Sequence, residues 1–409
     1  MKGATAKFIC GFVLVASLHA ETPLIADFRH EGDHLKACGD LKSIFGCVST
    51  LFTDHPLHIS AGSIAPGNGL AAGGAFVTHW TPGESWTLNA DADAVASVNG
   101  SWRAGGYLTA VFTPRRTIVA RPGGSPRKSN LAVKESLVMH GYAQSTSLSK
   151  LAYFGLGPDT RDTNRSYFGM RETIAGGDVV WPVWKTANIS LVGEANERSV
   201  DLRAGVDKSS PSIETLYTEA TAPGLTRPGS FTQTGEGVRL RPEFAGGYVQ
   251  LNYLVKFQQY ASHGDSQLSF QRLTLDFSHQ FVLHLATRPT FGMDSNGPND
   301  CGDDTAAHAC PAVSNNREGS IGLRFLMNQS FIPEGHVVPF YFQPTLGGSD
   351  INGNASLGSY QDYRFRGANT MLMRASFEHS IYGPLGFLAM FDSGKVAAKR
   401  SDLDFSERN

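Results

Sequence analysis

The sequence predicts an all-β protein, an antiparallel transmembrane β-barrel, and three observations support this prediction. Apolar and polar residues alternate with a period of two over many segments of about ten residues. Glycine is abundant, at 45 of 409 residues, while charged residues make up only 18%. The amino terminus has the form of a secretory signal peptide, which directs a chain out of the cytoplasm.

The alternation is clearest in the segment 249–257. Its odd-numbered residues are all apolar, and Gln250, Asn252 and Lys256 lie on the other face. In a membrane barrel the apolar set faces lipid and the polar set faces the lumen. The segment 273–285 repeats this pattern, and Leu268 and Phe270 before it have the opposite phase, which indicates a β-bulge near Gln271. Further strands, about 12 to 14 in all, are expected at 69–80, 85–98, 101–113, 131–142, 167–184, 188–202, 320–331, 336–343, 363–378 and 385–396.

The first residues have the order of a signal peptide. Lys2 and Lys7 precede an apolar run, and small residues follow, so cleavage is expected after Ala20, with Ser17 as the alternative. Residues 21–66 then form a periplasmic lead-in, residues 67–397 the barrel and residues 398–409 a polar tail. No later segment is apolar for long enough to predict a transmembrane helix.

The cysteines outside the signal form two close pairs, Cys38 with Cys47 and Cys301 with Cys310. A secreted chain folds in an oxidising compartment, so two local disulfides are expected. The alternative is one metal site made by all four thiolates, which requires two distant loops to meet. The prediction is therefore no metal and no cofactor.

Several motifs match enzyme signatures but lack the context that the chemistry requires. The run His30 to His34 fits H-E-x-x-H, yet Gly32 weakens any helix that would place both histidines on one face. The run Gly67 to Ala72 fits a dinucleotide fingerprint, but a strand pattern follows where a helix is needed. No G-x-S-x-G elbow is present, and a net charge of −2 argues against nucleic acid as a partner. We expect no enzymatic activity.

Two stretches near the end of the chain resemble a known family. They are LGGSDINGNASLGSYQDYRFRG at 346–367 and GPLGFLAMFDSGKVA at 383–397, and they resemble the barrel of the bacterial surface antigen family, the BamA/TamA outer-membrane assembly superfamily. The segments 153–160, 165–173 and 337–348 are similar to the mid-barrel loop, the strand after it and the entry into the large lumenal loop.

The resemblance implies a protein of the bacterial outer membrane, with sixteen strands as the family expectation. Many members carry periplasmic POTRA domains, for which the segment 21–66 is too short, so a barrel-only member is expected. The charged tail differs from the terminal aromatic strand that is usual in such barrels, and this indicates a chain that lacks its last strands.

In the family, a loop motif of the form Arg-Gly-aromatic meets an Asp in a strand motif close to Phe-x-Asp-x-Gly. Here the matching loop positions, 357–360, contain no Arg, whereas the strand motif is kept at 391–394. Two partners for Asp392 are open: Arg374, nearly opposite in the same hairpin, or one of Arg364 and Arg366 from the loop. Parity in a continuous strand places both loop arginines in the lumen. The candidate residues for contacts between loop and barrel are Gly347, Gly348, Tyr360, Asp362, Arg364, Arg366, Arg374, Asp392 and Gly394.

The resemblance implies a protein that helps insert or translocate proteins or lipids, with outer-membrane lipid and client outer-membrane proteins as partners. The alternative is a passive channel or structural surface barrel, which the missing loop Arg and POTRA domains favour. A lipid-modifying enzyme would need Ser, His and a carboxylate clustered on the lumenal face, and the sequence shows no such cluster.

Overall fold

The computed structural model describes residues 56–82, 85–113, 137–205, 207, 209–290, 312–382 and 385–403. The chain divides into two compact units, Met1–His58 and Ile59–Asn409, and the description below concerns the second. The predicted signal peptide, the cysteine pairs and the His30–His34 motif lie outside the described residues.

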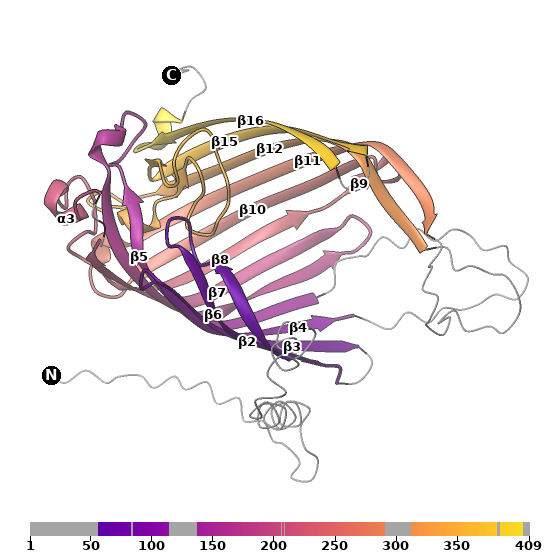
Figure 1. The fold of residues 1–409 in the computed structure, drawn as a ribbon, viewed down its shortest axis with the longest axis horizontal. Coiled ribbons are helices and arrows are strands. Elements are labelled where there is room, and N and C mark those ends of the chain that lie inside the picture. The colour runs from indigo at the N-terminus through magenta and orange to yellow at the C-terminus, as the bar shows by residue number, and fades with distance from the viewer. Residues whose placement is uncertain are drawn as a thin grey trace, which may run out of the picture. The chain divides into compact units, whose positions relative to one another are not determined.

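Long antiparallel strands dominate the described part of the chain, as the sequence predicts (Figure 1). One sheet contains 14 strands in the order β1-β2-β3-β4-β5-β6-β7-β8-β10-β11-β12-β15-β16, with β9 paired to β10. These strands are β1 (Leu57–Ser63), β2 (Leu70–Trp80), β3 (Trp86–Ser97), β4 (Trp102–Phe112), β5 (Leu137–Tyr153), β6 (Ser166–Trp184), β7 (Ile189–Ala204), β8 (Ser230–Leu240), β9 (Glu243–Phe244), β10 (Val249–Ser262), β11 (Phe270–Thr290), β12 (Ala312–Phe331), β15 (Asn369–Tyr382) and β16 (Leu385–Ala397).

The remaining elements are short and lie in the connections. A second, two-stranded sheet pairs β13 (Thr345–Leu346) with β14 (Phe365–Arg366). The helical turns are η1 (Asp162–Asn164), α3 (Ile213–Leu216), η2 (Ala245–Gly247), η3 (Ser266–Leu268), η4 (Phe340–Phe342) and η5 (Arg400–Asp402). No helix in the described ranges has the length and apolar character needed to cross a membrane.

The register of the sheet separates two faces. We call inner the face that carries Glu194, Lys256, Asp276, Arg324 and Asp392, and outer the opposite face. The inner charges are paired: Arg324 Nη2 lies 2.8 Å from Asp276 Oδ2. Because neighbouring residues of a strand point to opposite faces, the apolar odd-numbered residues of β10 lie on the outer face, as the alternation predicts.

Strand β8 is absent from the strands that the sequence predicts, since it has few apolar residues and two glycines. Those glycines are structural. A Cβ on Gly235 would lie 2.6 Å from Glu194 Oε1, and one on Gly237 would lie 2.6 Å from the Val255 carbonyl oxygen. Lys256 on β10 therefore reaches over β8 to Glu194 on β7, with 2.5 Å between Nζ and Oε2.

Two predicted strands differ from the observed ones. The segment 336–343 contains η4 instead of a strand, because Pro339 and Pro344 lie on either side of this turn and proline cannot donate to a β-ladder. The segment 363–378 begins with Tyr363 outside any strand, at a positive φ of 60°, and then divides into β14 of the small sheet and β15 of the main sheet. The segment 336–343 and the residues before β15 contribute to the interior.

Two further details differ from expectation. The predicted bulge near Gln271 is absent, since the β10–β11 register runs without a shift from Val249–Phe281 to Tyr260–Phe270. Phe270 belongs to the unshifted part of β11 and points to the inner face, where it is buried beside Tyr260 and Phe342, whereas Leu268 lies in η3 before the strand. The sheet also begins at Leu57, earlier than the expected boundary at residue 67.

A buried cluster, the aromatic cluster, packs where β5, β6, β8, β10 and β11 meet the loop segments. Phe340 lies at its centre, with ring centroids 5.2 Å from Tyr153 and 5.0 Å from Phe168. Phe342 lies 4.9 Å from Phe231. The other buried members include Leu148, Leu151, Ile213, Tyr260, Leu268, Phe270, Val338, Tyr341 and Tyr363.

Candidate functional site

The candidate site is the connection from β12 to β15, residues 332–368, which we call the inner loop. Its middle rests on the inner face of the sheet, where Leu346 and Leu357 pack against Leu326, Leu372 and Val396 (Figure 1). The loop is therefore fixed within the interior of the fold and contributes to its packing.

Gly347 and Gly348 permit the sharp course of the chain after β13. Their φ angles are +100° and +57°, which favour glycine. A Cβ would also lie 2.6 Å from Arg364 Cβ at the first position and 2.5 Å from the Asp362 nitrogen at the second. Asp362 holds this turn, because its Oδ1 accepts a 2.7 Å hydrogen bond from the Ser349 N–H.

Arg374 and Asp392 clamp the loop to β15 and β16. The register pairs them directly, and Arg374 Nε lies 2.7 Å from Asp392 Oδ1. Asp392 Oδ2 also accepts a 3.0 Å hydrogen bond from the Leu357 N–H, and Arg374 Nη2 donates a 2.7 Å bond to the Ala355 carbonyl oxygen. Leu357 occupies the position at which the family's loop motif has its Arg. In this chain the Leu357 backbone N–H binds Asp392 from the loop, and the arginine that binds Asp392 is Arg374 of β15.

Gly394 makes room for the loop beside this clamp. It lies opposite Leu372 in the register of β15 and β16. A Cβ at this position would lie 2.9 Å from Leu346 Cδ1 and 3.1 Å from the Met371 carbonyl oxygen. The glycine of the Phe-x-x-Gly run therefore serves close packing between sheet and loop in this chain.

Arg364 does not reach Asp392, contrary to the second option drawn from the sequence. Its guanidinium donates to the Thr160 hydroxyl at 2.5 Å and to the Thr160 carbonyl oxygen, in the connection from β5 to β6. The group also lies 5.0 Å from the Phe154 ring and 4.7 Å from the Phe365 ring. Such cation–π contacts add to the attraction where water is displaced.

Arg366 does not reach Asp392 either. It is only 6% exposed, and its Nη1 donates to the carbonyl oxygens of Phe340 at 2.7 Å and Gln343 at 3.4 Å. Its own carbonyl oxygen accepts a 2.8 Å bond from the Gly157 N–H. Burial lowers the pKa of the Arg366 guanidinium to about 10, an effect that the nearby Tyr153 and Tyr363 oppose.

Tyr363 is also placed differently from the parity of a continuous strand, which would put it on the face opposite the two arginines. Tyr363 is 3% exposed and belongs to the aromatic cluster, so it does not face lipid. Its hydroxyl donates to the Pro66 carbonyl oxygen at 3.3 Å. Tyr360 packs its ring 4.9 Å from Phe365. The cause is the break at Tyr363, because parity holds only along an unbroken strand.

The structure therefore divides the predicted arginines between two anchors. Arg374, with Asp392 and Gly394, forms the β15–β16 anchor. Arg364 and the Arg366 carbonyl oxygen form a second anchor, to the β5–β6 connection, while the Arg366 guanidinium binds η4 within the inner loop itself. The sequence reasoning did not identify Ala355 or Phe340 as partners, because each is bound through a backbone oxygen that any residue supplies. It also missed Thr160, which accepts through its hydroxyl as well as its backbone oxygen. No cluster of metal-ligating side chains occurs among the residues that the structure describes.

Comparison with known proteins finds similarity in structure but not in sequence. No protein-family model and no curated protein sequence matches the chain. Among solved structures, CdiB from Acinetobacter baumannii is similar with a TM-score of 0.43 and 10% identity, over 84% of this chain and 49% of that one. BamA from Haemophilus ducreyi, lacking POTRA domains 1-3, is similar with a TM-score of 0.45 and 12% identity, over 86% of this chain and 60% of that one. The chain thus spans about half of the first protein and 60% of the second.

Proposed function

We propose that this chain is a bacterial outer-membrane β-barrel protein that assists the insertion or translocation of proteins or lipids, and that it catalyses no covalent reaction. The observation that supports this role most is the inner loop, which is fixed to the β15–β16 hairpin by the clamp and to the β5–β6 connection by the second anchor. BamA belongs to the assembly superfamily that the sequence resembles.

The sheet has the properties that a membrane location requires. A tilted strand crosses the hydrocarbon core with about 9 to 11 residues, and β6, β11 and β12 contain 19, 21 and 20. The inner face carries the paired charges, whereas the outer face exposes large apolar side chains such as Leu191, Val255 and Phe391. This division between a polar interior and an apolar exterior is typical of transmembrane barrels.

The inner loop favours the assembly role over the passive channel. A passive channel conducts through an open interior, but here the aromatic cluster and the clamped loop occupy the inner face. Neither anchor depends on the loop Arg that the family motif contains, because Arg374 supplies the charge from the sheet. The absence of that Arg from the sequence therefore does not leave the loop unattached.

A vesicle experiment tests the proposal. The full chain is reconstituted into phospholipid vesicles, and an unfolded outer-membrane protein is added from urea. We expect faster insertion of this client than with empty vesicles, and low ionic conductance across a planar bilayer that holds the same protein.

The control is the same protein, heat-unfolded before it is mixed with lipid. Steady conductance without any gain in client insertion would support the passive channel instead. A protein that does not enter the vesicles at all would overturn the membrane location itself.

A further inference from the structure

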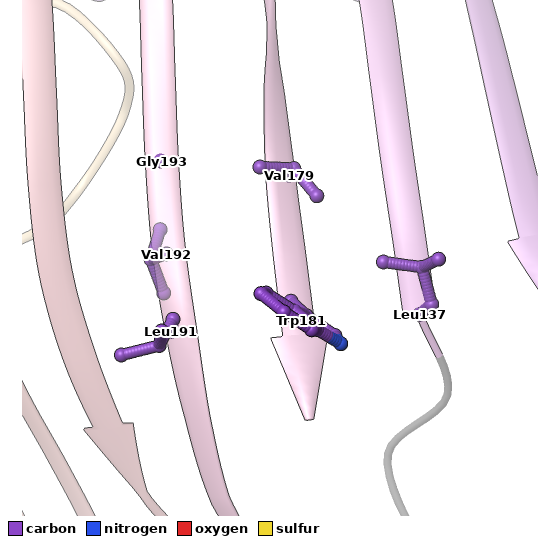
Figure 2. Close-up of a pocket in the computed structure, with 6 residues that line it drawn as sticks. All are labelled: Leu137, Val179, Trp181, Leu191, Val192 and Gly193. Carbon is purple, nitrogen blue, oxygen red and sulfur yellow. The ribbon is translucent and has the colours of Figure 1, made fainter. Parts of the chain in front are cut away.

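An apolar groove lies on β5, β6 and β7 near the ends of these strands (Figure 2). Its volume is about 370 Å³, and it is lined by Leu137, Val179, Trp181, Leu191, Val192 and Gly193. No charged or hydroxyl side chain is among these residues, so the lining offers a ligand apolar contacts, backbone and the indole N–H of Trp181. Grooves of this size are within the range that holds small ligands.

The register places the groove on the outer face, with Val192 as the one lining residue whose side chain belongs to the inner face. Val179 pairs with Gly193, and Trp181 pairs with Leu191. The next residue along β7, Glu194, is one of the inner charges and pairs with Lys256. Because successive residues alternate, Gly193 and its cross-strand partner Val179 point outward.

Gly193 lines the groove without a side chain of its own. Two of its neighbours on the outer face are large, because Trp181 and Leu191 are 56% and 41% exposed. A Cβ at position 193 would lie 3.3 Å from Val179 Cγ1, so a side chain there would crowd Val179.

We propose that this groove holds one acyl chain of a membrane phospholipid, an inference that rests on the membrane location proposed above. The groove opens on the outer face, where the exposed Glu236 pairs with Gly193 on one side and Trp181, 56% exposed, lines the groove on the other. Trp184, 59% exposed, follows three residues later in β6. Tryptophan gathers where the hydrocarbon core meets the headgroups. An acyl chain that lies between the Trp181 ring and Val179 replaces contacts with mobile lipid tails by contacts with a fixed apolar surface. Such contacts require no polar partner.

Tryptophan fluorescence tests the inference directly, because Trp181 lines the groove. The chain contains 5 tryptophans, and a variant keeps Trp181 alone, with the other positions changed to Phe. It is reconstituted in vesicles with a rising fraction of phospholipid brominated in its acyl chains, which quenches indole on contact. We expect steeper quenching of Trp181 than of Trp86 in the equivalent variant that keeps Trp86 alone.

Two groove variants and one control sharpen the result. Gly193→Leu fills the groove, so the excess quenching of Trp181 should be lost, whereas Val179→Ala widens it and should retain the excess. Gly141→Leu is the matched control, because Gly141 lies on the outer face of β5 and a Cβ there meets nothing within 4 Å. This change should leave Trp181 quenching as it is.

The outcomes separate the inference from the function on which it rests. Equal quenching of Trp181 and Trp86 overturns the acyl-chain site and leaves the membrane location standing. No quenching at either tryptophan overturns both. Weaker quenching of Trp181 than of Trp86, together with a crosslinked dimer, assigns the groove to a second copy of the chain and overturns the lipid.

Discussion

Arg374 faces Asp392 across the β15–β16 hairpin, with its Nε 2.7 Å from Oδ1 and its Nη2 2.8 Å from Oδ2. The side chains are only 18% and 7% exposed, so the pair is shielded from water on most sides. Bidentate, charge-assisted hydrogen bonds of this kind fix the relative orientation of the two side chains and are stronger than neutral hydrogen bonds. The pair also binds backbone groups of the inner loop, so one ion pair holds both the hairpin and the loop.

Asp392→Ala should release the inner loop. It removes the acceptor of the Arg374 pair and of the Leu357 N–H, and leaves the arginine without its partner. Breaking one side of a buried pair costs about 3 to 5 kcal/mol. Limited proteolysis with mass spectrometry should find new cleavage between residues 349 and 362, and urea unfolding should give the loss of stability.

Replacing both partners, Arg374→Leu with Asp392→Leu, is the control for an unpaired charge. This double variant should regain much of the stability, because no charge is left unpaired. The loop should still be open to protease, since the Ala355 carbonyl oxygen and the Leu357 N–H lose their hydrogen bonds to Arg374 and Asp392. A loop in Asp392→Ala that resists protease as well as the wild type would contradict the clamp.

Gly394→Val should displace the loop by crowding. The new side chain would meet Leu346 Cδ1 and the Met371 carbonyl oxygen, and overpacking of this kind costs about 1 to 3 kcal/mol. Leu346→Ala removes one of the two clashes, so Gly394→Val should lower the urea midpoint less in the Leu346→Ala background than in the wild type. An equal or larger loss in that background would mean that the glycine does not serve loop packing.

Glu236→Leu should stabilise the protein in lipid. Glu236 on β8 pairs with Gly193 and Phe257 of the outer face, and no hydrogen bond or ion pair reaches it within the described residues. A charge facing lipid is unfavourable, by less for Glu than the about 2 to 4 kcal/mol of Arg or Lys at the midplane. Unfolding in urea from vesicles measures the gain. Glu194→Leu, on the inner face beside Lys256, should lower stability instead.

Acid should loosen the connection between β7 and β8. Burial raises the pKa of the Glu219 carboxyl, but the Thr226 and Gly224 amides and Arg227 bind the carboxylate, and the net result is a pKa lowered from 4.5 to about 2. A depressed pKa gives stability that is present above the unfolded value and is lost as pH falls through the folded value. Hydrogen exchange of residues 213–229 should therefore speed up between pH 4.5 and about 2.

Glu219→Gln is the control for this titration, because other carboxyls also titrate in acid. Its exchange in the same segment should be faster at neutral pH and should change less on acidification than that of the wild type. Parallel pH profiles for the two proteins would show that Glu219 is not the group responsible.

The two disulfides stay predictions, since Cys38, Cys47, Cys301 and Cys310 lie outside the described residues. Peptide mapping without reductant should recover each pair as one linked species. Each bond should contribute about 2 to 3 kcal/mol by closing a short loop in the unfolded chain. Free thiols at all four positions, detected by alkylation before digestion, would contradict the pairing.

The sheet was predictable because its signal is local. The predicted segments 69–80, 101–113 and 167–184 match β2, β4 and β6 closely, since alternation along one strand is written in consecutive residues. The same locality explains the pairing of Arg374 with Asp392, which follows from counting back from a hairpin turn. Strand β8 was missed because Gly235 and Gly237 make room for side chains of its neighbours, and that reason is visible only in three dimensions.

The inner loop was less predictable, because its contacts join residues far apart in the chain. Arg364 and Arg366 are candidate contact residues in the sequence, but most of their partners are backbone oxygens, such as those of Thr160 and Phe340, which leave no trace in residue type. Parity also failed at Tyr363, because its positive φ keeps this first residue of the predicted segment outside the strand. The position of the inner loop therefore follows from contacts that exist only in the folded chain.

The two anchors of the inner loop differ in how much chain they enclose, and this sets an order of folding. The clamp joins residues separated by 18 positions, whereas the Arg364 bond to Thr160 spans 204. Closing a longer stretch of chain costs more entropy, and contacts of high sequence separation form slowly. The loop should first settle on the β15–β16 hairpin and reach the β5–β6 connection only after the intervening strands have assembled. The Arg364 contact is thus a late step, completed when the sheet has brought its two ends within reach.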